Sequence, residues 1–445
     1  MSPLKTSAIL LLALFLSPTA SFAGAPAPSD ELEKTHSEAV RLYEAGEYRR
    51  ALEKFEAALK LAPREKTIRV NLGRSCVALA SQIMESTTGD DPRELEHAAQ
   101  LLQRALLHWE GDAQTHELIA LCALRRRRLP EAERALATAL ERDASSGRTW
   151  NLLGVVRDQQ GKIGPAIEAL EEAYRRAPSD AAIEKRLRRL KHDRTTIAEG
   201  RPLMSARFRV FVPPEISVTE GRKVLDLLEE TAATLERRWG GETPSGVEVI
   251  LYPPGEFSRR TGLSEEVGGA FDGRIRVAFP TELTAGGLTL DQVIRHETAH
   301  LYLHRFSTSI PRWLDEGLAQ LVDGGDRTQW ATRFLEGGGS APELGLRQRE
   351  RGVGIRGGAE WAGLYLHSYL FLKHLEEVHG RFRLDLAVRR IARGTPPEKA
   401  FEEVYGKGPI LLDRAWRASL REPSSASGEK AEDAGGVQKP GGQSR

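Results

Sequence analysis

The sequence predicts a multidomain protein in which an all-α repeat solenoid precedes an α+β domain. At 445 residues the chain exceeds the size of one typical hydrophobic core, so two or three domains are expected. Small and large apolar residues recur every 34 residues in the first half, whereas alternating strands followed by helices occupy the second half. These two patterns divide the chain before any functional motif is considered.

The repeat array is indicated by three sets of residues that keep one spacing. Ala98, Ala132 and Ala166 follow one another at steps of 34 residues. Two further sets keep the same step: Leu102, Leu136, Leu170 and Ala105, Ala139, Ala173. These residues resemble the tetratricopeptide repeat, in which small residues let paired helices approach and the stacked pairs form a concave groove for a peptide or protein partner. Four repeats are expected over residues 32–180, followed by a charged capping helix and linker over residues 181–200.

Both ends of the chain are expected to lie outside the folded domains. Residues 1–23 combine Lys5, an apolar run and small residues, which is typical of a cleaved secretory signal. A membrane anchor is the alternative, but the apolar run is shorter than the ~20 residues that cross a bilayer. Residues 422–445 have few apolar side chains and are expected to be disordered. We therefore expect an exported protein, periplasmic or secreted, with no membrane span after signal cleavage.

Composition narrows the classes of function. A formal net charge of +1 gives the chain no global field for nucleic acid, so DNA or RNA binding is not expected. The two cysteines, Cys76 and Cys122, fall in different repeats and are expected to be buried thiols, with a disulfide as the alternative. The run Arg125–Arg128 is expected to be a loop between helices, with a basic patch in the groove as the alternative.

A zincin-like α+β domain is expected over residues 203–421. Residues 207–214 and 246–254 alternate apolar and polar positions and end in proline pairs, as strands that end in turns do. Residues 220–239 have the spacing of an amphipathic helix. Residues 268–280 predict another strand of a small mixed sheet, and helices dominate the rest of the domain.

The stretch HETAH, which begins at His296, carries the chemistry expected of this domain. Thr289 and Gln292 form a capping box, and a helix that starts there stacks His296 and His300 one turn apart on one face. Two neutral imidazoles in this arrangement can bind one cation, and Glu297 can reach a water on it without being a ligand. Zinc bound in this way makes that water a nucleophile near neutral pH, with Glu297 as general base and acid.

A second helix is expected to supply the third ligand. Pro311 marks its start, and Trp313 and Leu314 begin an apolar stripe at helical spacing. Glu316 lies within this apolar segment, where an unpaired carboxylate is costly and coordination to zinc would remove the cost. Gly317 beside it is expected to let this helix pack closely against the first.

These residues resemble the gluzincin metallopeptidases, in particular the peptidase MA-like group, whose pattern is HExxH followed by a Trp-x-x-Glu-Gly-x-Ala helix. The resemblance covers roughly residues 208–420. It implies that His296, His300 and Glu316 hold Zn²⁺ and that Glu297 is the catalytic acid and base. The chain is therefore expected to be a zinc metallopeptidase, more specifically an endopeptidase, which acts on a peptide or protein substrate.

The resemblance suggests further roles near the metal. Tyr365 stands where a tyrosine of this group stabilises the oxyanion, with simple packing as its alternative role and His367 as a second candidate. The segment GGAFDGRIRV looks like the edge strand that binds an extended substrate, and it offers Asp272 where related aminopeptidases hold the free amine with a glutamate. Gln320 replaces an acidic residue that orients a ligand histidine in many gluzincins, and Asp315 is the alternative source of that carboxylate.

Two interpretations stay open. His304 lies one turn beyond His300 and is expected to be a helix-end cation rather than a ligand. The alternative function is a tetratricopeptide scaffold with an inactive zincin-like domain. Glu297 favours the enzyme, because a scaffold needs no general base.

Overall fold

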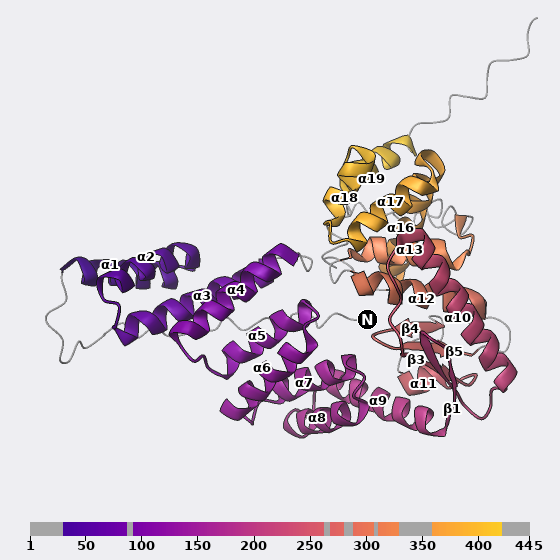
Figure 1. Ribbon diagram of the computed structural model, residues 1–445, viewed down its shortest axis with the longest axis horizontal. Coiled ribbons are helices and arrows are strands. Elements are labelled where there is room, and N and C mark those ends of the chain that lie inside the picture. Colours follow the sequence, from indigo (N-terminus) through magenta and orange to yellow (C-terminus); the bar gives the residue numbers. More distant parts are fainter. Residues whose placement is uncertain are drawn as a thin grey trace, which may run out of the picture.

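The computed structural model shows a curved array of helix pairs that leads into an α+β domain (Figure 1). It describes residues 30–86, 92–261, 268–279, 288–306, 310–328 and 358–420. The expected signal segment and the C-terminal tail lie outside these residues. Among the helices described, none has the length and apolar character needed to cross a membrane.

The first eight described helices form four pairs, in agreement with the four repeats that the spacing predicts. The pairs are α1 (Asp30–Glu44) with α2 (Tyr48–Leu61), α3 (Lys66–Ser86) with α4 (Pro92–His108), α5 (Ala113–Arg125) with α6 (Leu129–Arg142), and α7 (Gly147–Gln159) with α8 (Ile163–Arg176). Ala132 and Ala166 are fully buried. A Cβ added to Gly154 would lie 2.6 Å from Cγ of Leu170, so α7 and α8 are too close there for a larger residue.

The cysteines and the arginine run of the array behave as expected. Cys76 and Cys122 are free and buried, as expected, and they form no disulfide. Burial raises the pKa of both thiols to about 11. Arg125–Arg128 spans the end of α5 and the short loop before α6. Arg126 pairs with Glu96 at 2.6 Å, which ties this loop to the preceding repeat.

Helix α9 (Ala181–Glu199) covers the end of the array, but it is more than a cap. The side chain of Asp180 accepts hydrogen bonds from the backbone of Ala182 and Ile183 and so fixes the start of the helix. Leu187 packs against α8, as a capping helix should. Ile197 packs on the sheet of the second domain, so α9 makes contacts with both domains.

The described strands form one five-stranded mixed sheet. They are β1 (Arg201–Met204), β2 (Phe208–Val212), β3 (Val247–Tyr252), β4 (Gly269–Phe271) and β5 (Ile275–Ala278). The order is β1-β2-β3-β5-β4, with β2, β3 and β5 parallel and the two edge strands antiparallel to their neighbours. The single strand expected over residues 268–280 is a hairpin, because Gly273 takes a φ of 109° and turns the chain. The exposed strand β1 has no alternating pattern and was not expected.

Helices cover both faces of the sheet. Helices α10 (Val218–Trp239) and α12 (Leu290–Phe306) pack on one face, where Val249 and Val277 are fully buried. Helices α9 and α11 (Phe257–Thr261) pack on the other. A capping box between Ser217 and Glu220 starts α10.

The remaining helices surround a second core beside α12. They are α13 (Arg312–Asp323), α16 (Gly358–His379), α17 (Arg381–Ala392), α18 (Pro397–Tyr405) and α19 (Pro409–Ser419). Trp313, Phe371 and Phe401 are fully buried at its centre. A Cβ added to Gly317 would lie 2.8 Å from the carbonyl oxygen of Ser368, so this glycine allows close packing against α16 and not, as expected, against the histidine helix.

A set of buried charged side chains joins the array to the sheet. We call these residues the junction cluster: Asp158, Arg189, Asp193, Glu248, Asp272, Arg274, Arg276. They come from α7, α9, β3 and the β4–β5 hairpin. Asp272 pairs here with Arg189 at 2.7 Å and with Arg276, so its carboxylate is held at the junction and is not available to a substrate amine.

Candidate metal centre

Helix α12 begins as expected and sets the orientation of both histidines. The backbone N–H of Gln292 donates to Oγ1 of Thr289 at 3.2 Å, and the N–H of Thr289 donates to the amide oxygen of Gln292 at 3.0 Å. This capping box fixes the first turn. The four-residue spacing then places His296 and His300 on the same face, which looks toward α13.

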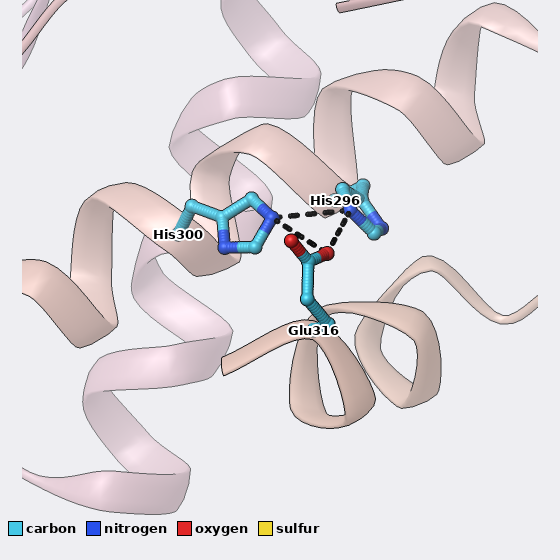
Figure 2. Close-up of side chains that lie close together, drawn as sticks. All are labelled: His296, His300 and Glu316. Carbon is cyan, nitrogen blue, oxygen red and sulfur yellow. Dashed lines mark hydrogen bonds and ion pairs between the residues drawn. The ribbon is translucent and has the colours of Figure 1, made fainter. Parts of the chain in front are cut away.

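Three side chains from α12 and α13 converge on one point (Figure 2). Nε2 of His296 lies 3.1 Å from Nε2 of His300. Oε2 of Glu316 lies 3.7 Å from the first of these nitrogens and 3.6 Å from the second. Tetrahedral zinc with bonds of about 2.1 Å separates its ligand atoms by about 3.4 Å, so the three atoms fit such an ion.

The other ring nitrogens of the two histidines are held by carboxylates. Nδ1 of His296 lies 3.1 Å from Asp323, and Nδ1 of His300 lies 2.9 Å from Asp315. Each carboxylate keeps its imidazole oriented and leaves Nε2 directed at the site. Arg327 in turn holds Asp323 at 2.7 Å. Asp315 is therefore a partner of a candidate ligand and does not face solvent.

Gln320, which replaces the acidic residue of many gluzincins, does not orient a ligand histidine. Its side-chain nitrogen donates to the backbone oxygens of Glu316 at 3.1 Å and Tyr365 at 2.9 Å, and so links α13 to α16. The carboxylate expected at this position is supplied by Asp323, which sequence reasoning missed. Asp323 lies seven residues, or about two helical turns, beyond Glu316, so helical periodicity alone places it on the same face.

The local charges agree with a cation site. Burial lowers the pKa of His296, but hydrogen bonds to Asp323 and Glu316 outweigh it and raise the pKa to about 9. Burial raises the pKa of Glu316, yet the charge of His300 and the bonds to both imidazoles hold it well below its usual range. Zinc binds imidazole nitrogens that carry no proton, so a metal ion must displace any proton on either Nε2.

Glu297 lies beside the three converging side chains and against the edge strand. The residue is 5% exposed, and burial raises the pKa of its carboxyl group. Gly269 of β4 comes so close that an added Cβ would lie 2.8 Å from Cγ of Glu297. A glycine at this position therefore lets β4 run along α12 directly over the predicted general base.

Tyr365 and His367 occupy different environments although both belong to α16. The hydroxyl of Tyr365 donates to Oε1 of Glu316 at 3.1 Å, and Nε of Arg312 lies 3.9 Å from the same oxygen. Burial and the charge of Glu316 raise the pKa of Tyr365, so its phenol keeps its proton. His367 instead pairs with Asp413 of α19 at 2.7 Å, so the structure favours Tyr365 over this second candidate.

His304 is tied to the same network. Its Nε2 lies 2.8 Å from Oδ2 of Asp315, which also holds His300, and its ring contacts Phe271 of β4 edge-on. His300, His304 and Asp315 form a second group with metal-ligand spacing in the described residues. His304 is therefore not simply a helix-end cation, because it shares a carboxylate with a candidate ligand.

Asp323→Asn is expected to weaken metal binding about 10–100-fold, because the oriented carboxylate behind His296 is lost while all three candidate ligands remain. Competition with a chromophoric zinc chelator measures the change in affinity. Asp326→Asn is the matched control, since Asp326 lies three residues further on and pairs with Lys373 in a mainly exposed position. Equal zinc affinities for the wild type and Asp323→Asn would contradict the assignment.

Comparison with known proteins identifies the array. Residues 36–80, 93–147 and 119–181 match the model of the tetratricopeptide repeat family. The array consists of tetratricopeptide repeats. Repeats of this kind generally bind proteins or peptides, which suggests a protein-binding role for the array. A comparison with curated proteins gives no match for the chain. The family match ends at residue 181, before the metal centre begins.

Three solved structures have some likeness to part of this chain. The crystal structure of MamA has 16% identity, covers 35% of this chain and 84% of that chain, and gives a TM-score of 0.29. YrrB, described as a TPR protein with an unusual peptide-binding site, has 15% identity and gives a TM-score of 0.29. The match covers 36% of this chain and 76% of that chain. A thermophilic TPR protein of Thermus thermophilus has 22% identity and gives a TM-score of 0.25. The match covers 37% of this chain and 83% of that chain. At these TM-scores the likenesses carry no argument about function.

Proposed function

We propose that the chain is an exported zinc-dependent peptidase, more specifically an endopeptidase, whose tetratricopeptide repeats recruit a substrate or a protein partner. The observation that carries the proposal is the convergence of His296, His300 and Glu316, with Glu297 beside them. Export is proposed from the signal-like pattern of residues 1–23.

The donor set supports zinc over a harder cation. Two imidazole nitrogens and one carboxylate oxygen are the ligands of many catalytic zinc sites, whereas calcium and magnesium prefer oxygen ligands. Asp315 and Asp323 support the ligand role further, because metal-binding histidines usually donate their second N–H to a carboxylate. When bound, zinc would supply the Lewis acidity that makes water a nucleophile near neutral pH.

The protein side chains supply the proton transfer and the positioning. Glu297 is buried beside the site with a raised pKa, which suits a group that accepts a proton from water and passes it to a leaving amine. Tyr365 keeps its proton and lies next to Glu316, so it can donate a hydrogen bond to a developing oxyanion. The edge strand β4 can bind an extended peptide through its backbone, which favours broad sequence specificity.

An endopeptidase is favoured over an aminopeptidase by the position of Asp272. Its carboxylate is occupied by Arg189 and Arg276 at the junction cluster, so the hairpin presents no acidic group of its own to a substrate amine. A peptide bound along β4 can then extend in both directions from the site.

Metal analysis of the full chain tests the proposal. Dialysed wild-type protein is expected to retain about one zinc ion per chain, and His296→Ala to bind zinc at least about a hundredfold more weakly, because a tetrahedral site loses one of three protein ligands. Elemental mass spectrometry measures the zinc, and a broad peptide library measures cleavage before and after chelation. Cleavage should stop with the chelator and return when zinc is added.

His304→Ala is the matched control, because this histidine lies on the same helix but outside the proposed set. It is expected to retain zinc much better than His296→Ala. If His304→Ala loses the metal and His296→Ala does not, the ion occupies the group of His300, His304 and Asp315, and the proposed site is wrong. If the wild type binds zinc but cleaves no peptide in the library, the chain is a repeat scaffold with an inactive second domain.

A further inference from the structure

The junction cluster connects the last tetratricopeptide repeat to the hairpin that carries the edge strand. Arg274, in the β4–β5 turn, donates to Asp158 of α7 and, through Nε at 2.7 Å, to Glu248 of β3. Asp272, in the same turn, accepts from Arg189 of α9 at 2.7 Å. The hairpin turn is therefore held by side chains from two helices that precede the sheet domain in sequence.

These contacts are buried, which makes them expensive to break. Arg274 is only 3% exposed, and the side chains of Asp158 and Asp272 are each 8% exposed. When a buried charge loses its partner, water cannot easily take the partner's place, so the loss is costly. An exposed charge that loses its partner is solvated by water at little cost. Arg189 links the two acids, since it pairs with Asp272 and also lies 3.4 Å from Asp158.

The hairpin turn is directly continuous with the part of β4 that faces the candidate metal centre. Gly269 lies against Glu297, and Phe271 contacts the ring of His304. The N–H of Asp272 donates to Arg274 and the N–H of Ala278 donates to Gly268, so the backbone groups of Gly269 and Phe271 point away from β5. In the described sheet β4 is an edge strand, so these groups are on its outer side.

We propose that Asp158 and Arg189 are positioning residues for substrate binding. Through them the last repeat and α9 fix the β4–β5 hairpin, and so fix the distance between the edge strand β4 and Glu297. The repeats are then a fixed part of the peptide-binding cleft as well as a recruiting surface. A partner that shifts α7 on binding moves the hairpin through Arg274. This inference rests on the proposed peptidase function only in identifying β4 as the substrate strand.

The test uses Asp158→Ala and the milder Arg189→Gln in the full chain. The matched control is Glu133→Ala, which removes a carboxylate that also pairs with two cations, Arg157 at 3.1 Å and Lys162 at 2.9 Å, but lies entirely within the repeats. Hydrogen exchange of residues 268–279 reports on the hairpin without any need for activity. Both junction variants are expected to exchange these amides about tenfold faster or more, because a hydrogen bond between charged groups is lost.

The kinetic measurement separates positioning from general damage. In an active enzyme, both junction variants are expected to raise KM for an extended peptide about tenfold with kcat near the wild-type value, because binding along β4 is weakened and the catalytic groups are untouched. Zinc content should stay the same in all variants, and Glu133→Ala should match the wild type throughout. Faster exchange of the hairpin in both junction variants, with the KM increase, supports the proposal.

Unchanged hairpin exchange in Arg189→Gln and Asp158→Ala overturns the proposal, as does faster exchange without a change in KM. If Asp158→Ala fails to fold, hairpin exchange and KM of Arg189→Gln alone test the proposal. Arg189 is partly exposed, so its substitution destabilises the fold less. If the wild-type protein cleaves no peptide, the proposed function fails, but the exchange rates still show whether the repeats hold the hairpin.

Discussion

Glu297→Gln is expected to lower kcat for peptide cleavage about 10²–10⁴-fold while zinc stays bound, because proton transfer by a positioned side chain contributes a factor of this size. Glutamine keeps the shape of the side chain but accepts no proton. Glu297 is 5% exposed and lies beside Gly269, so the isosteric change should leave the packing of α12 against β4 intact. Single-turnover cleavage of a fluorogenic peptide measures the loss, and elemental analysis measures the zinc.

Glu316→Gln is the matched control for this experiment. The same change is made on a candidate ligand one helix away, and it is expected to reduce zinc affinity together with activity. The two variants thus separate the loss of a base from the loss of a ligand. A Glu297→Gln protein that kept a tenth or more of the wild-type kcat would show that another group takes the proton.

Arg276→Met is expected to lower the free energy of unfolding by about 3–5 kcal/mol, the cost of removing one partner from a buried ion pair. Arg276 is 1% exposed and Asp193 is fully buried. The guanidinium donates to Asp193 from Nε at 3.1 Å and from its terminal nitrogen at 2.6 Å, and it also pairs with Asp272. Methionine fills much of the volume but leaves Asp193 with Tyr252 as its remaining donor among the contacts described. Urea denaturation measures the change.

Arg188→Met is the control for Arg276→Met, because Arg188 forms an exposed pair with Glu184 on α9. Pairs of this kind contribute about 0–1 kcal/mol, so this variant should unfold close to the wild-type midpoint. A further variant, Arg276→Met combined with Asp193→Leu, should recover part of the stability, since Asp193 is then no longer a buried charge without its guanidinium partner. Equal midpoints for Arg276→Met and Arg188→Met would mean that the junction does not stabilise the fold.

Local spacing was enough to predict the cluster of candidate metal ligands. His296 and His300 are one turn apart on any helix that starts at Thr289, and the apolar pattern around Glu316 placed it on a second packed helix. The angle between α12 and α13 was not predictable in this way. Nor was the packing of α13 against α16, which comes from far along the chain: Gly317 lies close to Ser368 and Gln320 bonds to Tyr365, while Asp323 reaches His296.

The 34-residue spacing similarly predicted the helix pairs of the array, because each pair buries its own alanines. The contacts of α9 and of Asp272 in the junction cluster could not be predicted from local patterns. A charged helix with one apolar stripe has the composition of a terminal cap, and nothing within residues 181–200 indicates that Asp193 meets Arg276 from a strand some eighty residues later. Long-range ion pairs of this kind follow from the docking of two domains and not from periodicity.

The two cysteines allow the opening of the repeats to be measured by the rate of thiol modification. Cys76 and Cys122 are the only thiols of the whole chain, and both lie inside the helix array. Because burial raises the pKa of each to about 11, an alkylating reagent modifies them slowly until the surrounding helices separate. The rate of modification in native buffer therefore reports how often the second and third helix pairs open transiently. The sheet and the candidate zinc ligands do not contribute to this rate, because they contain no thiol.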